Sequence, residues 1–115
     1  MDMERPHRGE RWIEACLLCL LKEEDSYGYQ LQDQLNLLSL QENPIHISLI
    51  YRALQGMENR GLVVSFWTGG GPGPKKRVYS LTPDGSYALD LWMVRMRARR
   101  DMLTAMIDKY DGLKE

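Results

Sequence analysis

Residues 45–82 constrain the fold of this chain more than any other segment. A helix-like run, residues 45–61, is followed by an apolar, strand-like run, residues 62–67. A glycine-proline tip, residues 69–74, and a basic triplet then lead into a second strand-like run, residues 78–81. The order helix, strand, basic tip, strand predicts a winged helix. In such a unit the helix enters a DNA groove, and the hairpin, or wing, holds the phosphate backbone.

The length and composition predict one globular, soluble domain. The 115 residues are 43 % hydrophobic and 27 % charged, which is typical of such domains. No apolar run approaches the roughly 20 residues that span a bilayer. The first ten residues are polar and mixed in charge, unlike the apolar core of a secretion signal. We therefore expect a cytoplasmic protein with no membrane partner.

Positive charge is concentrated in the predicted winged-helix segment, although the whole chain has a net charge of −1. Residues 1–40 carry 4 basic and 8 acidic side chains, residues 41–82 carry 5 and 2, and residues 83–115 carry 6 and 6. The distribution favours contact with DNA through the central segment. The acidic flanks are expected to keep the non-specific affinity for DNA modest.

Apolar residues at helical spacing predict two helices ahead of this segment. The first covers residues 9–22 and the second covers residues 27–38. Ser26 or Asp25 is expected to cap the second helix. Gly28 lies in its first turn, where glycine normally costs stability. A close approach by another helix would explain it.

Cys16 and Cys19 have the C-x-x-C spacing that also occurs in redox and metal sites. They lie inside an apolar helical run, whereas a redox pair usually opens a helix after a strand. Zinc would need two more ligands, and the two histidines, His7 and His46, are far apart in the sequence. We interpret both cysteines as small core residues and expect no metal and no cofactor.

The helix expected over residues 47–60 has two different faces. Ile50, Leu54 and Met57 form the apolar face, and Gly61 fits a left-handed stop just past the helix end. The opposite face carries polar side chains, and no acidic residue lies between positions 45 and 57. An acid-free face suits a helix that approaches phosphates, and an ordinary solvated face is the alternative.

Four residues on this polar face are candidate DNA contacts. Arg52 is the leading one, because arginine pairs bidentately with guanine or binds phosphate. Tyr51 either donates its hydroxyl to a phosphate or serves only the core. Ser48 either donates to phosphate or caps the helix, and Gln55 contacts either bases or water. Tyr29, on the preceding helix, is expected in the core.

The basic triplet Lys75, Lys76 and Arg77 completes the predicted DNA-binding surface. The glycine-proline tip places these side chains on a projecting hairpin, where they would hold the backbone or the minor groove. A solvated run of charges is the alternative.

The last predicted helix is longer than a small core needs. Thr82 is expected to cap it, with Pro83 at its first position, and it continues to about residue 110. Its apolar residues form two stripes, and a helix that is apolar on two sides needs two partners. One partner is the chain's own domain, and the other is most simply the same helix of a second copy. We therefore expect a homodimer.

The predicted dimer interface is also a candidate site for an effector. Tryptophan and methionine suit adaptable apolar recognition, and a closed dimer core accounts equally well for the same residues. The candidate effector or dimer-interface residues are Trp12, Leu89, Trp92, Met93, Met96, Leu103 and Met106.

Four patches, in order, resemble the PadR-type transcriptional repressors. Residues 27–31 (YGYQL) are similar to the family's H-G-Y-x-[IL], and residues 50–62 (IYRALQGMENRGL) are similar to its L-Y-x-x-L-x-x-L-E-x-x-G-[LI]. Residues 73–79 (GPKKRVY) are similar to its basic wing, and residues 80–85 (SLTPDG) to its x-L-T-x-x-G. The resemblance covers about residues 12–110.

The resemblance implies a homodimeric repressor that binds a two-fold symmetric operator. The single helix after the wing is similar to the short PadR subfamily, whose members dimerise through it. Some of those members bind flat hydrophobic drugs between tryptophans at the dimer centre, and Trp92 occupies a similar position. His46, Ser48 and Leu49 replace the family's usual Ser, Gly and Thr before the third helix.

Two other functions fit parts of the sequence. An enzyme is disfavoured, because the glycine-rich tip lacks the Gly-Lys-Ser/Thr of a phosphate-binding loop and does not open a helix. A winged helix that docks a protein partner without reading DNA is the stronger rival, since the chain is not basic overall.

We therefore predict a mainly α fold with a small β hairpin, divided into three parts. Residues 1–10 would be a flexible arm, residues 11–82 a winged helix-turn-helix DNA-binding domain, and residues 83–115 a dimerisation helix. The predicted partners are double-stranded DNA, a second copy of the chain and a planar apolar effector.

Overall fold

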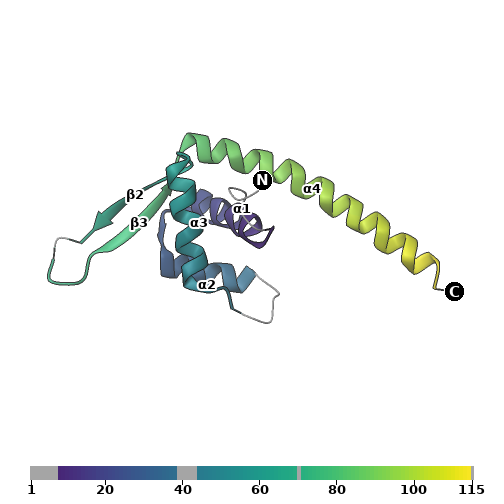
Figure 1. The fold of residues 1–115 in the computed structure, drawn as a ribbon, viewed down its shortest axis with the longest axis horizontal. Helices are drawn as coiled ribbons and strands as arrows, with labels where there is room; N and C mark the ends of the chain where they lie inside the picture. The colour runs from purple at the N-terminus through teal and green to yellow at the C-terminus, as the bar shows by residue number, and fades with distance from the viewer. Residues whose placement is uncertain (1–7, 39–43, 70, 115) are drawn as a thin grey trace, which may run out of the picture.

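The computed structural model describes residues 8–38, 44–69 and 71–114. Its elements in chain order are α1 (Arg8–Glu23), β1 (Ser26–Tyr27), α2 (Gly28–Leu38), α3 (Ile47–Asn59), β2 (Val63–Thr68), β3 (Lys76–Leu81) and α4 (Pro83–Gly112). Figure 1 shows α1, α2 and α3 gathered together, the β2–β3 hairpin projecting on one side and α4 extending on the other. The predicted mainly α winged helix with a small β hairpin is confirmed.

The apolar faces of the first three helices meet in one core. Burying a leucine or isoleucine side chain stabilises a fold by roughly 1.5–3 kcal/mol, so these helices hold one another in place. Val63 and Tyr79 extend the core into the sheet, and Leu89 extends it into α4. The largest fully buried side chains are Leu17, Leu18, Leu31, Leu35, Ile50, Leu54, Met57 and Val63.

The sheet has three antiparallel strands in the order β1-β3-β2. Strand β1 is a two-residue segment in which Ser26 pairs with Tyr79, and the sequence pattern did not predict it. Helix α2 begins at Gly28 and directly follows Tyr27, so the expectation that Ser26 or Asp25 caps it is wrong. The Ser26 hydroxyl donates to the carbonyl of Glu24 over 3.4 Å. Strand β1 could not be predicted from the sequence, because two residues are too few to show the alternation of a strand.

Helix α1 differs from its prediction in two respects. It begins at Arg8, within the segment predicted as a flexible arm, and residues 1–7 lie outside the described residues. Cys19 is exposed and Cys16 is half-buried, so the interpretation of both as core residues is wrong for Cys19. Cys19 and Glu23, one turn apart, are both exposed, because the apolar run of α1 extends onto the side of the helix that faces away from the core.

Local caps fix both ends of α3. His46 is the N-cap, and its Nδ1 accepts a hydrogen bond from the Ser48 backbone N–H over 3.2 Å. At the other end Gly61 has φ +79°, and the Leu62 N–H donates to the Met57 carbonyl over 2.9 Å. The predicted left-handed stop at Gly61 is confirmed.

Helix α4 begins as predicted and then leaves the domain. Thr82 Oγ1 accepts from the Gly85 N–H over 2.9 Å, and Pro83 follows it in the first turn. Leu89 is buried, whereas every residue from 97 to 114 is exposed. Figure 1 shows the C-terminal half of α4 running beyond the other helices. In the described parts of the chain, no helix has the length and apolar character needed to cross a membrane.

Candidate nucleic-acid interface

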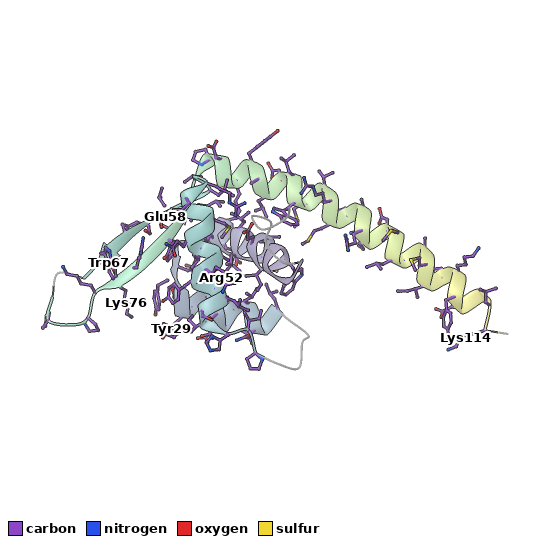
Figure 2. All side chains as sticks on the ribbon, in the orientation of Figure 1. Tyr29, Arg52, Glu58, Trp67, Lys76 and Lys114 are labelled. Atoms are coloured by element: carbon purple, nitrogen blue, oxygen red, sulfur yellow. The ribbon has the colours of Figure 1, made fainter. Side chains whose placement is uncertain are left out.

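The outward face of α3 carries the four polar residues that the sequence singled out. Ser48, Tyr51, Arg52 and Gln55 are all exposed, and Figure 2 shows Arg52 on the middle of α3. The Ser48 hydroxyl lies 2.8 Å from Nδ1 of His46, so Ser48 takes part in the helix cap.

The three basic residues of the triplet lie on the wing. Lys75 precedes β3, and Lys76 and Arg77 are its first two residues. All three are exposed. Thr68 pairs with Lys76 at the outer end of the hairpin, and the Thr68 hydroxyl donates to the Lys76 carbonyl over 3.3 Å. The ladder therefore holds Lys76 and Arg77 on ordered backbone.

An open groove connects α3 with the wing. Its volume is about 450 Å³, and it brings Tyr51 of α3 beside the basic triplet. Ser48, Arg52 and Gln55 are outside its lining and lie on the adjoining face of α3. Phosphate oxygens accept hydrogen bonds from phenol hydroxyls and from the N–H groups of lysine and arginine. The lining residues are Tyr27, Tyr29, Tyr51, Trp67, Lys75, Lys76, Arg77 and Tyr79.

Tyr29 belongs to this groove, so its predicted place in the core is wrong. Its side chain is 59 % exposed, and its ring meets that of Tyr51 edge-on, with the centroids 6.5 Å apart. The core face of α2 is set by Leu31 and Leu35, which leaves Tyr29 turned outward.

Gly28 makes room for Tyr51. A Cβ atom at Gly28 would lie 2.5 Å from the Tyr51 ring, which is far inside van der Waals contact. The close approach of another helix that the sequence predicted at Gly28 is therefore confirmed. Tyr51 of α3 is the side chain that approaches.

Arg77 is held by side chains of the protein. Its Nη2 lies 3.2 Å from Glu58 Oε1, and its Nε donates to Ser65 Oγ over 2.9 Å. The Ser65 hydroxyl in turn donates to Glu58 Oε2 over 2.8 Å. The guanidinium carbon also lies 5.9 Å from the centroid of the Trp67 ring and 5.6 Å from that of Tyr79.

Lys76 and Tyr79 also line the groove. The Lys76 Nζ lies 4.5 Å from the centroid of the Tyr27 ring, a cation–π distance. Burial raises the pKa of Tyr79 above its ordinary value of 10.0, and the nearby Arg77 charge opposes part of that rise. Tyr79 is therefore a neutral phenol at physiological pH.

Glu58, Ser65 and Trp67 are parts of this site that sequence reasoning missed. One signal was available for Glu58, which is the only acidic residue between positions 43 and 83. Trp67 is 64 % exposed, and Figure 2 shows it on the hairpin, where Lys76 also lies. Ser65 had no sequence signal, because its role depends on its register opposite Tyr79.

The predicted dimer-interface residues fall into two groups. Leu89 is in the core of its own domain, and Trp12, Trp92 and Met93 pack against that core. Met96 is half-buried, while Leu103 and Met106 are 47 % and 62 % exposed. The single chain therefore brings the first group together with its own core and leaves the distal residues on the free half of α4.

An exposed polar helix beside a basic, strand-paired hairpin defines the winged-helix class. The Transcriptional regulator PadR-like family matches residues 17–91, and the chain belongs to this family. No curated protein shows significant sequence similarity to it.

Solved structures share the fold. A PadR family transcription regulator from Clostridium difficile R20291 has a TM-score of 0.74 at 23 % identity, with 84 % of this chain and 98 % of that chain covered. A PadR-like transcriptional regulator from Bacillus cereus has a TM-score of 0.71 at 23 % identity, with 82 % and 89 % covered. Bacillus subtilis PadR, solved in complex with operator DNA, has a TM-score of 0.65 at 25 % identity, with 77 % and 49 % covered.

Proposed function

We propose that this protein is a DNA-binding transcriptional repressor that acts as a homodimer on a two-fold symmetric operator. The observation that carries the proposal is the groove in which Tyr51 of α3 lies beside Lys75 and Lys76 of the wing. Family membership supports a regulator. The complex of Bacillus subtilis PadR with operator DNA supports duplex DNA as the ligand.

In the proposed complex, two elements share the contacts with DNA. Helix α3 would enter the major groove with Arg52 and Gln55 toward base edges, and Tyr51 would donate to the flanking backbone. Lys75 and Lys76 would neutralise phosphates, which gives affinity that falls with salt. Such contacts position the protein, whereas Arg52 and Gln55 would supply sequence preference.

A second copy of the chain would pack on the exposed half of α4. Two copies would then present two α3 helices along one duplex, about 34 Å apart, which is one helical turn. A planar apolar effector between the copies would contact Trp92 and Met96. It would release DNA only by binding more tightly to an arrangement in which the two α3 helices no longer match the duplex.

Binding to duplex DNA tests the proposal. The probe is a random-sequence duplex of roughly 30 base pairs, long enough for two half-sites one turn apart, followed by fluorescence anisotropy. Arg52→Ala is expected to weaken binding by roughly 1–3 kcal/mol once a preferred sequence has been selected. Lys75→Ala with Lys76→Ala should weaken binding to every duplex. It should also make the slope of log affinity against log salt concentration shallower, by the equivalent of about one to two phosphate contacts.

The matched control removes the same charge elsewhere. Lys22→Ala with Lys114→Ala changes the net charge equally, and neither residue lines the groove. Figure 2 shows Lys114 at the far end of α4. If the native protein has no affinity for duplex DNA at low salt, or if both double variants behave alike, the DNA assignment is wrong. A protein-docking winged helix would then be favoured.

A further inference from the structure

Glu58 is in an unusual place for a carboxylate. It lies in the last turn of α3 (Ile47–Asn59), where the negative end of the helix dipole disfavours an anion. It also sits within the segment that otherwise carries only positive charge between positions 43 and 83. A carboxylate at this position repels phosphate and so lowers the affinity for DNA. Its presence therefore calls for a structural reason.

The contacts of Glu58 supply a structural reason for its place in α3. Its two oxygens receive separate partners, Arg77 on β3 and Ser65 on β2, and Arg77 also donates to Ser65. These three side chains form a closed triangle that joins the end of α3 to both strands of the wing. Arginine suits this role, because its planar fork presents two donors at a fixed angle.

Two aromatic rings also flank Arg77. Trp67 is its ladder partner in the hairpin, and the Trp67 and Tyr79 rings both lie within 6 Å of the guanidinium carbon. The side chain of Glu58 is only 28 % exposed and that of Arg77 is 45 % exposed. Moving Arg77 onto a phosphate would leave a largely buried carboxylate without its cation, next to DNA.

We propose that Arg77 is a positioning residue, which Glu58 and Ser65 hold so that the wing keeps a fixed angle to α3. Lys75 and Lys76 are then the members of the basic triplet that neutralise phosphates. This inference rests on the proposed function, because the fixed angle matters only if α3 and the wing engage one duplex together. Fixing the wing in the free protein reduces the ordering cost of binding.

A double-mutant cycle in the full chain tests this role. The variants are Glu58→Gln, Arg77→Ala and the combination, and the readout is anisotropy with the random duplex of roughly 30 base pairs. Arg77→Ala is expected to weaken binding about three- to fivefold, because a partly exposed ion pair contributes up to about 1 kcal/mol. In the Glu58→Gln background the same change should have an effect of less than about twofold, because the negative charge of the ion pair is already absent.

The salt dependence and the mobility of the wing separate positioning from phosphate contact. Arg77→Ala should leave the slope of affinity against salt unchanged, whereas Lys75→Ala with Lys76→Ala flattens it. Arg77→Lys keeps the charge but loses the fork, so it should bind as weakly as Arg77→Ala. Backbone order parameters from nitrogen relaxation should fall across β2 and β3 in Glu58→Gln and Arg77→Ala alike.

Three results would overturn the inference while leaving DNA binding intact. In the first, Arg77→Ala makes the slope of affinity against salt shallower by the equivalent of about one phosphate contact. In the second, Arg77→Lys binds DNA as tightly as the native protein. In the third, Arg77→Ala weakens binding as much in the Glu58→Gln background as in the native protein. Failure of the proposed function looks different, because the native protein and the lysine double variant would then both lack salt-dependent affinity for the duplex.

Discussion

The same helix gives its two cysteines different chemistry. Cys16 is half-buried against the core, and its burial, together with the neighbouring Cys19 thiol, raises its pKa from 9.0 to about 11. Cys19 lies one turn further along α1 and is exposed. A thiol reacts as the thiolate, so burial suppresses the reactivity of Cys16 both by access and by ionisation.

Thiol labelling is therefore expected to be selective. At about pH 8, below the ordinary thiol pKa, the folded protein should take up a maleimide at Cys19 well before Cys16. Peptide mass spectrometry after short exposures measures this order, and Cys19→Ser leaves only the slow site. In denaturant both thiols should label alike, because burial is lost. Equal rates in the folded protein would contradict the burial of Cys16.

At the scale of elements, the start of α4 is fixed by a tight junction with the end of α3. The Thr82 N–H donates to the Leu62 carbonyl over 3.1 Å, and the Thr82 hydroxyl donates to the Gly61 carbonyl over 2.7 Å. A Cβ atom at Gly85 would overlap the Leu62 carbonyl oxygen. The turn after α3 and the start of α4 therefore meet at a point with no space for a side chain.

A methyl group at this junction should destabilise the fold. Gly85→Ala is expected to lower the free energy of unfolding by about 1–3 kcal/mol, because the clash is with backbone that is fixed on both sides. Gly56→Ala is the matched control, since a Cβ there meets nothing within 4 Å. The control should gain up to about 1 kcal/mol from helix propensity. Urea unfolding measures both, and a Gly85→Ala protein as stable as the native one would refute the junction.

At the scale of the molecule, the chain is elongated, with extents of 66 × 30 × 28 Å. Figure 1 shows the wing and the end of α4 pointing away from each other. The projecting half of α4 exposes apolar side chains, which are Met102, Leu103, Met106, Ile107 and Tyr110. An apolar surface of this kind marks an interaction site, and a helix gains most of its stability from packing such a face.

Two charges on this half of α4 should prevent the proposed dimer. Leu103→Glu with Met106→Glu is expected to give a monomer in sedimentation equilibrium, because the interface would bury unpaired carboxylates. Leu37→Glu is the control, since Leu37 on α2 is 85 % exposed and should leave the assembly unchanged. Loss of the dimer should also lower the affinity for the operator, because one α3 would then bind without the other. A dimer that survives the double change would locate the interface elsewhere.

The sequence by itself determined the features that depend on a few neighbouring residues. Gly61 ended α3 and Thr82 began α4 as predicted, because caps are set by local backbone conformation. The order of helix, strand, tip and strand predicted the winged helix for a similar reason, since each element has its own periodicity. The polar face of α3 follows from that periodicity, so the exposure of Arg52 and Gln55 could be predicted from the sequence.

Only the tertiary structure decided which distant residues meet. Glu58 and Arg77 are 19 positions apart, and their contact depends on the register of the β2–β3 hairpin and on how α3 packs against it. The outward turn of Tyr29 was set in the same way, by which face of α2 the core took. Pairing and packing at long range are chosen by the whole fold, because each contact is stable only when the others have already placed its two partners.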